Sequence, residues 1–396
     1  MLFLDQVDIS GKRLLIRVDY NVPLDGNRIT DDNRIAASLP TLRHALDQGA
    51  SLVLCSHLGR PKGEVRSEFS LRPVAARLQE LLGREVRMAP DCIGAETEAL
   101  AGDLAPGQVL MLENLRFHAG ETKNDPEFSR SLAAMGDVYV NDAFGVSHRA
   151  HASVVGVTGH MDVCCGGFLL KKEWEYLGEA LTDPARPYVA IVGGSKVSSK
   201  LGILNALLDK VDSIIIGGAM ANTFRKAQGL GVGTSLVEND MLDDAMQVMV
   251  RAQESGVRLY LPVDVIMGTG PKGEVASGVR PYQDIPDDEM ILDSGPASHV
   301  LFSEVLKTAR TVVWNGPVGA FENPAFAQGS LGLCHTVAAL TDALTIVGGG
   351  DTGAIIHQVG LEENFSFLST GGGSFLEFLE GRELPAFKAL EECAAR

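Results

Sequence analysis

The chain has 396 residues, of which 45% are hydrophobic and 21% are charged, so it can bury a sizeable core and is longer than a single domain usually is. Its net charge of -17 at pH 7 argues against nonspecific binding to nucleic acid or to an anionic membrane, since both attract basic surfaces. We therefore expect two globular domains, no nucleic-acid or membrane partner, and a local cluster of basic residues wherever an anionic ligand binds.

The amino-terminal stretch MLFLDQVDIS places Asp5 and Asp8 where a signal peptide has a basic start and an apolar run. No later apolar stretch is long enough to span a bilayer, so we expect a cytoplasmic protein. The six cysteines contain no C-x-x-C pair, and Cys164 and Cys165 are adjacent, which is a poor basis for disulfides or a metal site. We expect the cysteines to be reduced and mostly buried.

The first half of the chain alternates short apolar runs with a longer amphipathic segment. The runs LLIRV, SLVLC, VLMLE and VYVND are typical of buried strands, whereas SLRPVAARLQELLG has apolar residues at helical spacing. The second half repeats this scheme with VAIVGG, SIIIGG, LYLPVDVIM, TVVWNGP, LTIVGGG and FSFLST. The alternation predicts an α/β protein with two doubly wound, Rossmann-like domains, each a parallel sheet flanked by helices.

The boundary between the two halves is the charged segment KKEWEYLGEALTDPARP, which Pro184 and Pro187 bring to an end. We interpret residues 171–185 as a connecting helix. The first domain then covers residues 1–170, and the second covers residues 186–379.

Ligands of open α/β sheets bind at the carboxyl ends of strands, so the loops after the predicted strands are the places to look for a site. In the first half these loops and the segment after the first one carry Arg17, Arg34, His57, Arg60, Arg116, His148, Arg149 and His151. Guanidinium groups suit bidentate capture of phosphate or carboxylate. Surface arginines paired with acids are the alternative, but their recurrence at successive strand ends favours a site for a small anion.

In the second half the corresponding loops are rich in glycine, at Gly193-Gly194, Gly217-Gly218, Gly348-Gly349-Gly350 and Gly371-Gly372-Gly373. Glycine lets a phosphate approach the backbone, and a helix amino terminus offers it free N–H groups. Lys196 and Lys200 are predicted to lie one turn apart on such a terminus, which suggests a polyphosphate ligand. A glycine pair can equally be a tight turn or a close packing contact.

Two acidic residues accompany the glycine loops. Asp351 either caps a helix or holds Mg²⁺ beside the phosphates, and Glu322 is a candidate partner for a ribose. The sequence has no P-loop motif and lacks the protein-kinase motifs. G-x-G-x-x-G occurs at Gly268 and at Gly348, but the first has no helix after it and the second lacks the acid that a dinucleotide ribose requires.

A site for a small anion and a site for a polyphosphate with metal are together typical of phosphoryl transfer, which needs mainly positioning and cations. If the acceptor is a carboxylate, it is already ionised at neutral pH and requires no general base. We expect a hinge motion about the connecting helix to exclude water before transfer.

The motifs RVDYNVP, SHLGRP, ENLRF, DAFGVSHRAHAS, GGSKVSSK, GGAMANTF, WNGPVGAFE, GGGDT and STGGGS resemble, in this order and over nearly the whole chain, those of the phosphoglycerate kinase family. The resemblance implies a monomeric, cytoplasmic, glycolytic transferase. Its reaction is reversible phosphoryl transfer between MgATP or MgADP and 3-phosphoglycerate or 1,3-bisphosphoglycerate. It also implies that a carboxyl-terminal segment of about residues 380–396 returns to the first domain.

The resemblance assigns each site residue by its motif. The triose substrate is expected against Asp19, Asn21, Arg34, His57, Leu58, Gly59, Arg60, Arg116 and Arg149. The nucleotide is expected against Gly193, Lys200, Gly217, Gly218, Asn315, Pro317, Glu322, Gly349, Gly350, Asp351 and Thr352, with Mg²⁺ at Asp351. The transferring phosphoryl group is expected against Arg34, Lys196, Gly371, Gly372 and Gly373.

Two other functions stay open. An NAD-dependent dehydrogenase would use the second G-x-G-x-x-G, but it lacks the ribose acid. A noncatalytic protein that binds anions or nucleotides would keep the basic cluster, but it has no use for Lys196 beside Lys200.

Overall fold

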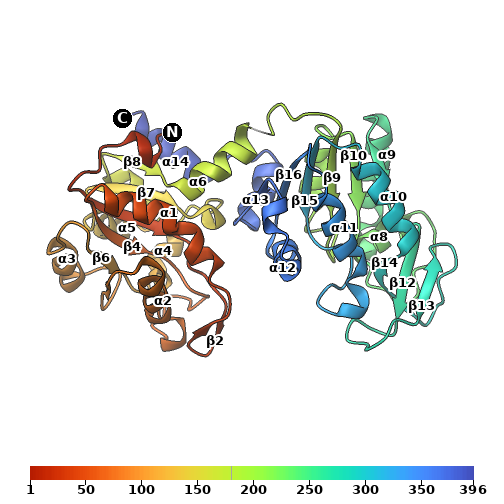
Figure 1. The fold of residues 1–396 in the computed structure, drawn as a ribbon, viewed down its shortest axis with the longest axis horizontal. Helices are drawn as coiled ribbons and strands as arrows, with labels where there is room; N and C mark the ends of the chain where they lie inside the picture. The colour runs from red at the N-terminus through yellow and green to blue at the C-terminus, as the bar shows by residue number, and fades with distance from the viewer. Residues whose placement is uncertain (180) are drawn as a thin grey trace. The chain divides into compact units, whose positions relative to one another are not determined.

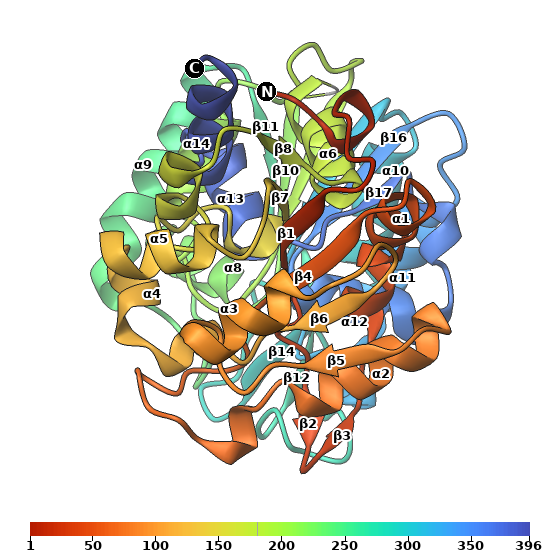
Figure 2. The ribbon, with the colours of Figure 1, turned by 90° about the vertical axis from the view of Figure 1, so that its left-hand side faces the viewer.

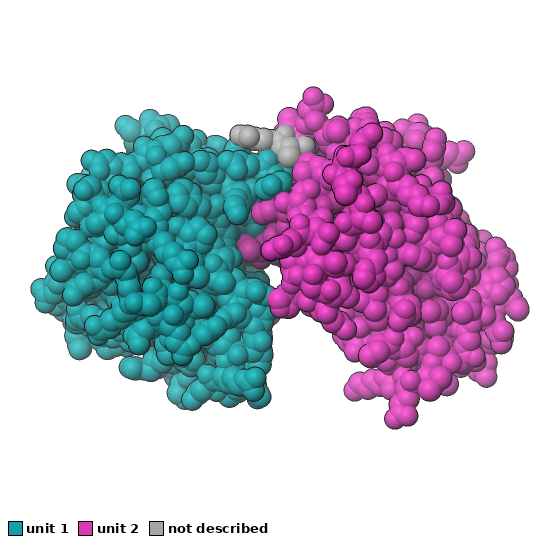
Figure 3. All heavy atoms as spheres, viewed as in Figure 1, with its two compact units in different colours: residues 1–178, 383–396 teal, residues 179–382 magenta. Residues whose placement is uncertain are grey.

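The computed structural model describes residues 1–179 and 181–396, so residue 180 of the predicted connecting segment lies outside the described residues (Figure 1). The chain forms two compact units (Figure 3). Unit 1 consists of Met1–Gly178 together with Glu383–Arg396, and unit 2 consists of Glu179–Arg382.

Unit 1 is built on a six-stranded sheet with the order β5-β6-β4-β1-β7-β8, in which every pairing is parallel. The strands are β1 (Arg13–Val18), β4 (Ser51–Cys55), β5 (Val86–Met88), β6 (Val109–Met111), β7 (Val138–Asp142) and β8 (Cys164–Gly166). A short hairpin, β2 (Leu24–Asp25) and β3 (Arg28–Ile29), lies outside this sheet.

The helices of unit 1 are α1 (Asn33–Asp47), α2 (Arg72–Leu82), α3 (Ala95–Gly102), α4 (Ala119–Lys123), α5 (Pro126–Ala133), α6 (Phe168–Glu173) and α14 (Pro385–Ala394). Figure 2 shows α1 and α2 on one face of the sheet and α4 and α5 on the other. Because both faces are covered, β4 and β7 are buried along their whole length, and this explains their continuous apolar runs.

The carboxyl-terminal helix α14 packs within unit 1. The Phe387 ring stacks on Phe144 with the ring centroids 6.1 Å apart, and the Ala386 N–H donates to the carbonyl of Ser147 at 3.1 Å. Helix α14, at the carboxyl-terminal end of the chain, therefore helps to hold the segment after β7 that carries Arg149.

Unit 2 has a second six-stranded parallel sheet, with the order β11-β10-β9-β15-β16-β17. Its strands are β9 (Tyr188–Val192), β10 (Ser213–Ile216), β11 (Arg258–Tyr260), β15 (Thr311–Asn315), β16 (Leu344–Gly348) and β17 (Phe367–Leu368). Its helices are α7 (Leu201–Leu207), α8 (Met220–Ala227), α9 (Leu242–Glu254), α10 (Pro296–Leu306), α11 (Gln328–Ala338), α12 (Gly350–Val359) and α13 (Gly373–Leu379). The predicted fold class is confirmed in both units.

The sequence prediction was wrong for LYLPVDVIM, which is not one strand. It divides around Pro262 into β11 and β12 (Asp264–Gly268), and β12 joins β13 (Gly278–Pro281) and β14 (Met290–Ser294) in a separate antiparallel sheet. Proline has no N–H to donate to a ladder, so the run cannot continue as a central strand. The small sheet has its own apolar cluster around Val265, Met267 and Tyr282.

The helical segment at the end of unit 1 begins at Phe168 rather than at Lys171. The Asp142 carboxylate accepts the backbone N–H groups of Leu169 and Leu170 at 2.9 and 3.2 Å, so it satisfies donors that a helix start leaves free. After α6 the helix continues with π geometry over Trp174–Glu179.

No helix within residues 1–179 or 181–396 is both long and apolar enough to cross a membrane. The six cysteines are buried and none forms a disulfide.

Candidate active site

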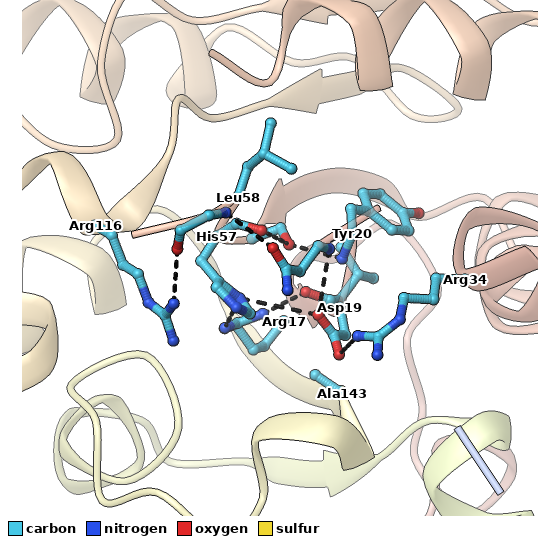
Figure 4. Close-up of polar contacts among 12 residues, drawn as sticks. Arg17, Asp19, Tyr20, Arg34, His57, Leu58, Arg116 and Ala143 are labelled. Carbon is cyan, nitrogen blue, oxygen red and sulfur yellow. Dashed lines mark hydrogen bonds and ion pairs between the residues drawn. The ribbon is translucent and has the colours of Figure 1, made fainter. Parts of the chain in front are cut away.

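Four basic residues of unit 1 converge near the carboxyl ends of neighbouring strands: Arg17, Arg34, His57 and Arg116 (Figure 4). Asp19 and Asn21 follow β1, the loop from His57 to Arg60 follows β4, Arg116 follows β6, and Arg149 lies beyond β7. Because β4, β1 and β7 are adjacent in the sheet, their loops share one edge.

Asp19 and Asn21 hold these loops together. Asp19 pairs with the Arg34 guanidinium of α1, and it accepts the backbone N–H of Asn21 at 3.3 Å. The Asn21 side-chain oxygen accepts the N–H of Gly59 at 2.8 Å. Gly59 has a φ of 61°, and a Cβ at this position would overlap the Phe69 ring, so the loop requires glycine here.

His57 is buried and uncharged. Its Nδ1 lies 3.2 Å from a guanidinium nitrogen of Arg17, and because guanidinium can only donate, Nδ1 accepts and the ring proton is on Nε2. Burial, followed by the positive charges of Arg17, Arg116, Arg149 and Arg34, holds the pKa of His57 well below its usual 6.5. His57 is therefore a neutral N–H donor, and four positively charged arginines lie near it.

The arginines repel one another across this site. Arg116 donates to the carbonyl oxygen of Gly59 at 2.8 Å, and its pKa is lowered to about 10 by burial and by the charges of Arg149 and Arg17. Arg116 is still protonated at neutral pH. Such a cluster of cations is arranged to receive an anion, since an anion would relieve the repulsion.

Two residues of the predicted basic cluster do not line an open site. Arg17 is fully buried, and it donates to the Ser153 hydroxyl at 2.8 Å and to the carbonyl of Val18. His151 has its Nδ1 3.6 Å from a carboxylate oxygen of buried Glu121. The prediction that both present charge at loop tips was wrong, because tertiary packing directs them inward, where Arg17 supports His57.

Sequence reasoning missed the buried groups behind the site. Glu121 accepts the backbone N–H and the hydroxyl of Ser153 at 2.9 and 2.7 Å. Burial raises the Glu121 pKa, but His151, Arg17 and Ser153 outweigh this effect and leave the pKa below its usual value. No motif or spacing links Glu121 to Arg17, so only the folded structure reveals the connection.

The remaining predicted residues of unit 1, Leu58, Arg60, His148 and Arg149, differ in burial and in hydrogen bonding. Asn114 donates to the carbonyl oxygens of Leu58 and Phe69 at 2.7 and 2.9 Å, which fixes the loop containing buried Leu58. Arg60 is exposed. Arg149 donates from Nε to His148 at 3.1 Å, and burial together with the charge of Arg149 lowers the His148 pKa to about 4.

In unit 2 the glycine loops bring three backbone segments into contact. A Cβ on Gly193 would overlap the carbonyl oxygen of Pro317, and one on Gly217 would overlap the Val318 side chain. Gly218 has a φ of 71° and donates its N–H to the carbonyl of Val318 at 3.0 Å. These glycines are needed for close packing of the loops after β9, β10 and β15.

Lys200 and Asp351 approach each other beside these loops. The Lys200 ammonium donates to the Asn315 side-chain oxygen, and Asn315 in turn donates to the carbonyl of Gly348 at 2.7 Å. Burial lowers the Lys200 pKa, while the negative charge of Asp351 opposes the shift. Thr352 accepts the N–H of Gly316 at 2.8 Å, which connects α12, beginning at Gly350, to the end of β15.

The two lysines are not one helical turn apart, contrary to the sequence prediction. Helix α7 begins at Leu201 with Lys200 as its N-cap, and Lys196 is exposed in the preceding loop. Glu238 holds this loop by accepting the N–H and hydroxyl of Ser198 at 3.0 and 2.6 Å, and these bonds compete with helix formation.

The third glycine run precedes α13. Gly371 and Gly372 lead into α13, which begins at Gly373, and the Gly371 N–H donates to the Ser369 hydroxyl at 3.2 Å. The Phe375 ring occupies the space that a Cβ on Gly348 would need. Helix α13, which this loop precedes, therefore packs against the end of β16.

A pocket of about 300 Å³ lies against these loops. Four of the predicted nucleotide residues line it: Gly218, Pro317, Glu322 and Asp351. Its apolar wall was not predicted and includes Leu236, Tyr282, Met290, Leu292 and Phe321. Met290 and Leu292 come from β14 of the antiparallel sheet, and the sequence of an apolar strand does not reveal which pocket the strand will face.

The family model described as phosphoglycerate kinase matches residues 4–382. The chain is 60% identical to a phosphoglycerate kinase of Maridesulfovibrio salexigens, covering 99% of this chain and 100% of that protein. It is 53% identical to one from Desulfotalea psychrophila over 98% of this chain and 99% of that protein. Phosphoglycerate kinase structures from Coxiella burnetii and Pyrococcus horikoshii superpose with TM-scores of 0.89 and 0.88, at 44% and 30% identity. The first covers 99% of both chains and the second 100% of both. The two parallel sheets, the arginine cluster and the glycine loops thus occur in a chain that belongs to the phosphoglycerate kinase family.

Proposed function

We propose that the chain catalyses reversible phosphoryl transfer between MgATP and the carboxylate of 3-phosphoglycerate, giving MgADP and 1,3-bisphosphoglycerate. As a member of its family the chain is a kinase whose acceptor is a carboxyl group. The observation that carries the proposal for the acceptor is the arginine cluster around neutral His57 in a protein of net charge -17. A small, multiply charged anion is the ligand that relieves this repulsion.

Each group in unit 1 has a proposed task. Arg34, Arg60, Arg116 and Arg149 bind the phosphate and carboxylate oxygens, and guanidinium suits both. His57 donates its Nε2 proton to a substrate oxygen. Asp19 and Asn21 orient Arg34 and the loop at Gly59, as their hydrogen bonds support.

The pocket of unit 2 is proposed to take the nucleotide. Its apolar wall suits the base, and Glu322 accepts from the ribose hydroxyls. Lys200 and the backbone around Gly193, Gly217, Gly218, Gly349 and Gly350 bind the phosphates, with Asn315, Pro317 and Thr352 holding the loops in place. The α12 amino terminus adds free N–H groups and the positive end of its dipole.

Asp351 fits a role as Mg²⁺ ligand. Its carboxylate is exposed, lines the pocket and is close enough to Lys200 to influence its pKa. Mg²⁺ is commonly bound by one or two carboxylates together with substrate phosphates and water, so a single acid suffices. When bound, the ion would neutralise phosphate charge.

We propose that Lys196, Arg34 and the Gly371–Gly373 loop stabilise the charge on the transferring phosphoryl group. The acceptor carboxylate is ionised at neutral pH, so no residue of the chain is needed as general base. The hinge motion, the monomeric state, the cytoplasmic location and the glycolytic role stay predictions.

The test is ADP formation with MgATP and 3-phosphoglycerate, with the product removed by a coupled dehydrogenase. We expect turnover that disappears without divalent metal and falls at least about a hundredfold in Arg34→Ala. Arg28→Ala, an exposed arginine of the β2–β3 hairpin, is the matched control and should retain full activity. Retained turnover in Arg34→Ala, or MgATP binding without any turnover, would contradict the proposal.

A further inference from the structure

Three potential metal ligands meet at the carboxyl ends of two neighbouring strands of unit 1. Strands β5 and β6 pair in parallel, and the loops after them carry Asp91 and Cys92 on one side and His118 on the other. One ligand atom from each of the three residues lies within 4.8 Å of the other two. This is the edge of an open α/β sheet at which ligands bind.

The backbone holds these residues in place. The Ala89 N–H donates to the carbonyl of Met111 at 2.8 Å, which joins the start of the loop after β5 to the last residue of β6. The Asp91 carboxylate accepts the N–H of Cys92 at 2.6 Å and lies 2.8 Å from His118 Nε2. The His118 ring packs on Phe128, with the ring centroids 5.6 Å apart. Hydrogen bonds and a ring contact therefore hold the three residues close together.

The types of ligand atom indicate which metal ion fits the cluster. We propose that Asp91, Cys92 and His118 bind Zn²⁺, with a water molecule as the fourth ligand. Sulfur, imidazole nitrogen and carboxylate oxygen are the donors that zinc uses, and three protein ligands leave one position open. Mg²⁺ and Ca²⁺ prefer oxygen ligands alone, so a buried cysteine selects against them.

Charge and geometry are consistent with this ion. The Cys92 thiol releases its proton as zinc binds, and the His118 ring carries its proton on Nδ1 once Nε2 coordinates the metal. Zn²⁺ with one thiolate, one carboxylate and a neutral imidazole is an uncharged centre. Tetrahedral zinc needs its ligand atoms about 3.5 Å apart, so Asp91 and His118, whose ligand atoms are 2.8 Å apart, must separate slightly as the metal enters between them. The Asp91 and His118 side chains are 41% and 30% exposed, which allows this movement and gives the metal access.

The site is separate from the proposed phosphoryl-transfer residues, and Asp351 belongs to the other unit. His118 follows Arg116 by two positions, so bound zinc would hold the loop that contains Arg116. We therefore expect the metal to raise thermal stability, because a ligand that binds only the folded state stabilises it.

Co²⁺ can report on this centre, because its visible bands distinguish tetrahedral from octahedral coordination and its near-ultraviolet charge-transfer band requires a thiolate. The chelator-treated, reduced full chain is titrated with Co²⁺ in the absence of nucleotide. We expect one equivalent to give tetrahedral bands and the thiolate band, both removed by Zn²⁺, together with a higher melting temperature. Cys92→Ala should lose the thiolate band, and Cys334→Ala, another buried cysteine in α11, should keep it.

His118→Gln provides a second test that leaves the buried thiol in place. Loss of a direct ligand should weaken Zn²⁺ binding at least about a hundredfold, since even changes to outer-shell partners cost 10- to 100-fold. The proposal is overturned if the wild-type protein gives no thiolate band. It is equally overturned if His118→Gln binds Zn²⁺ as tightly as the wild type, or if Cys92→Ala keeps the band.

Discussion

The two candidate ligand sites use opposite means to recognise their ligands. In unit 1, charged side chains converge and are supported by buried polar groups such as Glu121 and Ser153. In unit 2, glycine backbone and an apolar pocket dominate, with Lys200 as the half-buried cation. A small anion has little apolar surface, so charge must hold it, whereas a nucleotide also offers a base that an apolar wall can cover. The difference implies that substitutions in the two units will impair ligand binding in different ways.

The largest effect is expected at Lys196, which is exposed and is proposed to contact only the transferring group. Lys196→Ala should lower kcat by about 10² to 10³, because a donor to developing charge is lost, while MgADP affinity stays nearly unchanged. Steady-state kinetics and calorimetry measure the two quantities. Lys226→Ala, which removes another exposed lysine of unit 2, is the control. Wild-type kcat in Lys196→Ala would remove this residue from the mechanism.

Glu121→Gln tests the buried support of unit 1. Arg17 would lose the negative charge that compensates it, and we expect the free energy of unfolding to fall by about 3 kcal/mol. Urea unfolding measures the change. Glu127→Gln removes an exposed partner of Arg130 and should change the stability by less than about 0.5 kcal/mol. Equal effects of the two substitutions would mean that Glu121 does not support the basic cluster.

Gly193→Ala tests the backbone packing of unit 2. The new Cβ would overlap the Pro317 carbonyl, so we expect a loss of about 2 kcal/mol in stability and weaker MgADP binding. Binding of 3-phosphoglycerate should not change. Gly231→Ala meets open space in the same unit and should be tolerated. A fully stable Gly193→Ala with normal MgADP affinity would contradict the close-packing argument.

The smallest effect concerns the pH dependence of stability due to His57. Its pKa is lowered in the folded state, so the unfolded chain binds more protons below pH 6.5, and this contribution to stability is lost as the pH falls from 6.5 toward the folded pKa. Relative to His57→Gln, the wild type should lose up to about 1.4 kcal/mol per pH unit. The comparison with the variant is needed because burial raises the pKa of Asp142 and Asp293 to about 7, which acts in the opposite direction. Parallel stability curves from pH 7 to pH 5 would show that His57 is not held neutral.

The sequence was sufficient to predict the two parallel sheets, because strands buried on both faces leave continuous apolar runs such as SLVLC and VYVND. It also indicated which loops carry His57 and Arg116, since strand ends can be located from these runs.

What the sequence could not provide depends on tertiary contacts. Arg17 lies near the end of β1 and Asp19 directly follows this strand, yet only Arg17 is fully buried, and no local pattern separates these two outcomes. Lys196 and Lys200 have helical spacing, but Glu238, far along the chain, holds the segment as a turn. Pro262 is a sequence signal that LYLPVDVIM does not form one strand. Nothing in the sequence indicates that its second part joins a separate antiparallel sheet.

The central claim is that unit 1 binds the acceptor through arginine charge and unit 2 binds the nucleotide. Calorimetric titration of the wild type, Arg34→Ala and Lys200→Ala with 3-phosphoglycerate and, separately, with MgADP tests this claim most directly. We expect Arg34→Ala to lose most of its affinity for 3-phosphoglycerate and to keep its affinity for MgADP, and Lys200→Ala to show the reverse. Loss of MgADP affinity in Arg34→Ala with 3-phosphoglycerate binding intact would contradict the account.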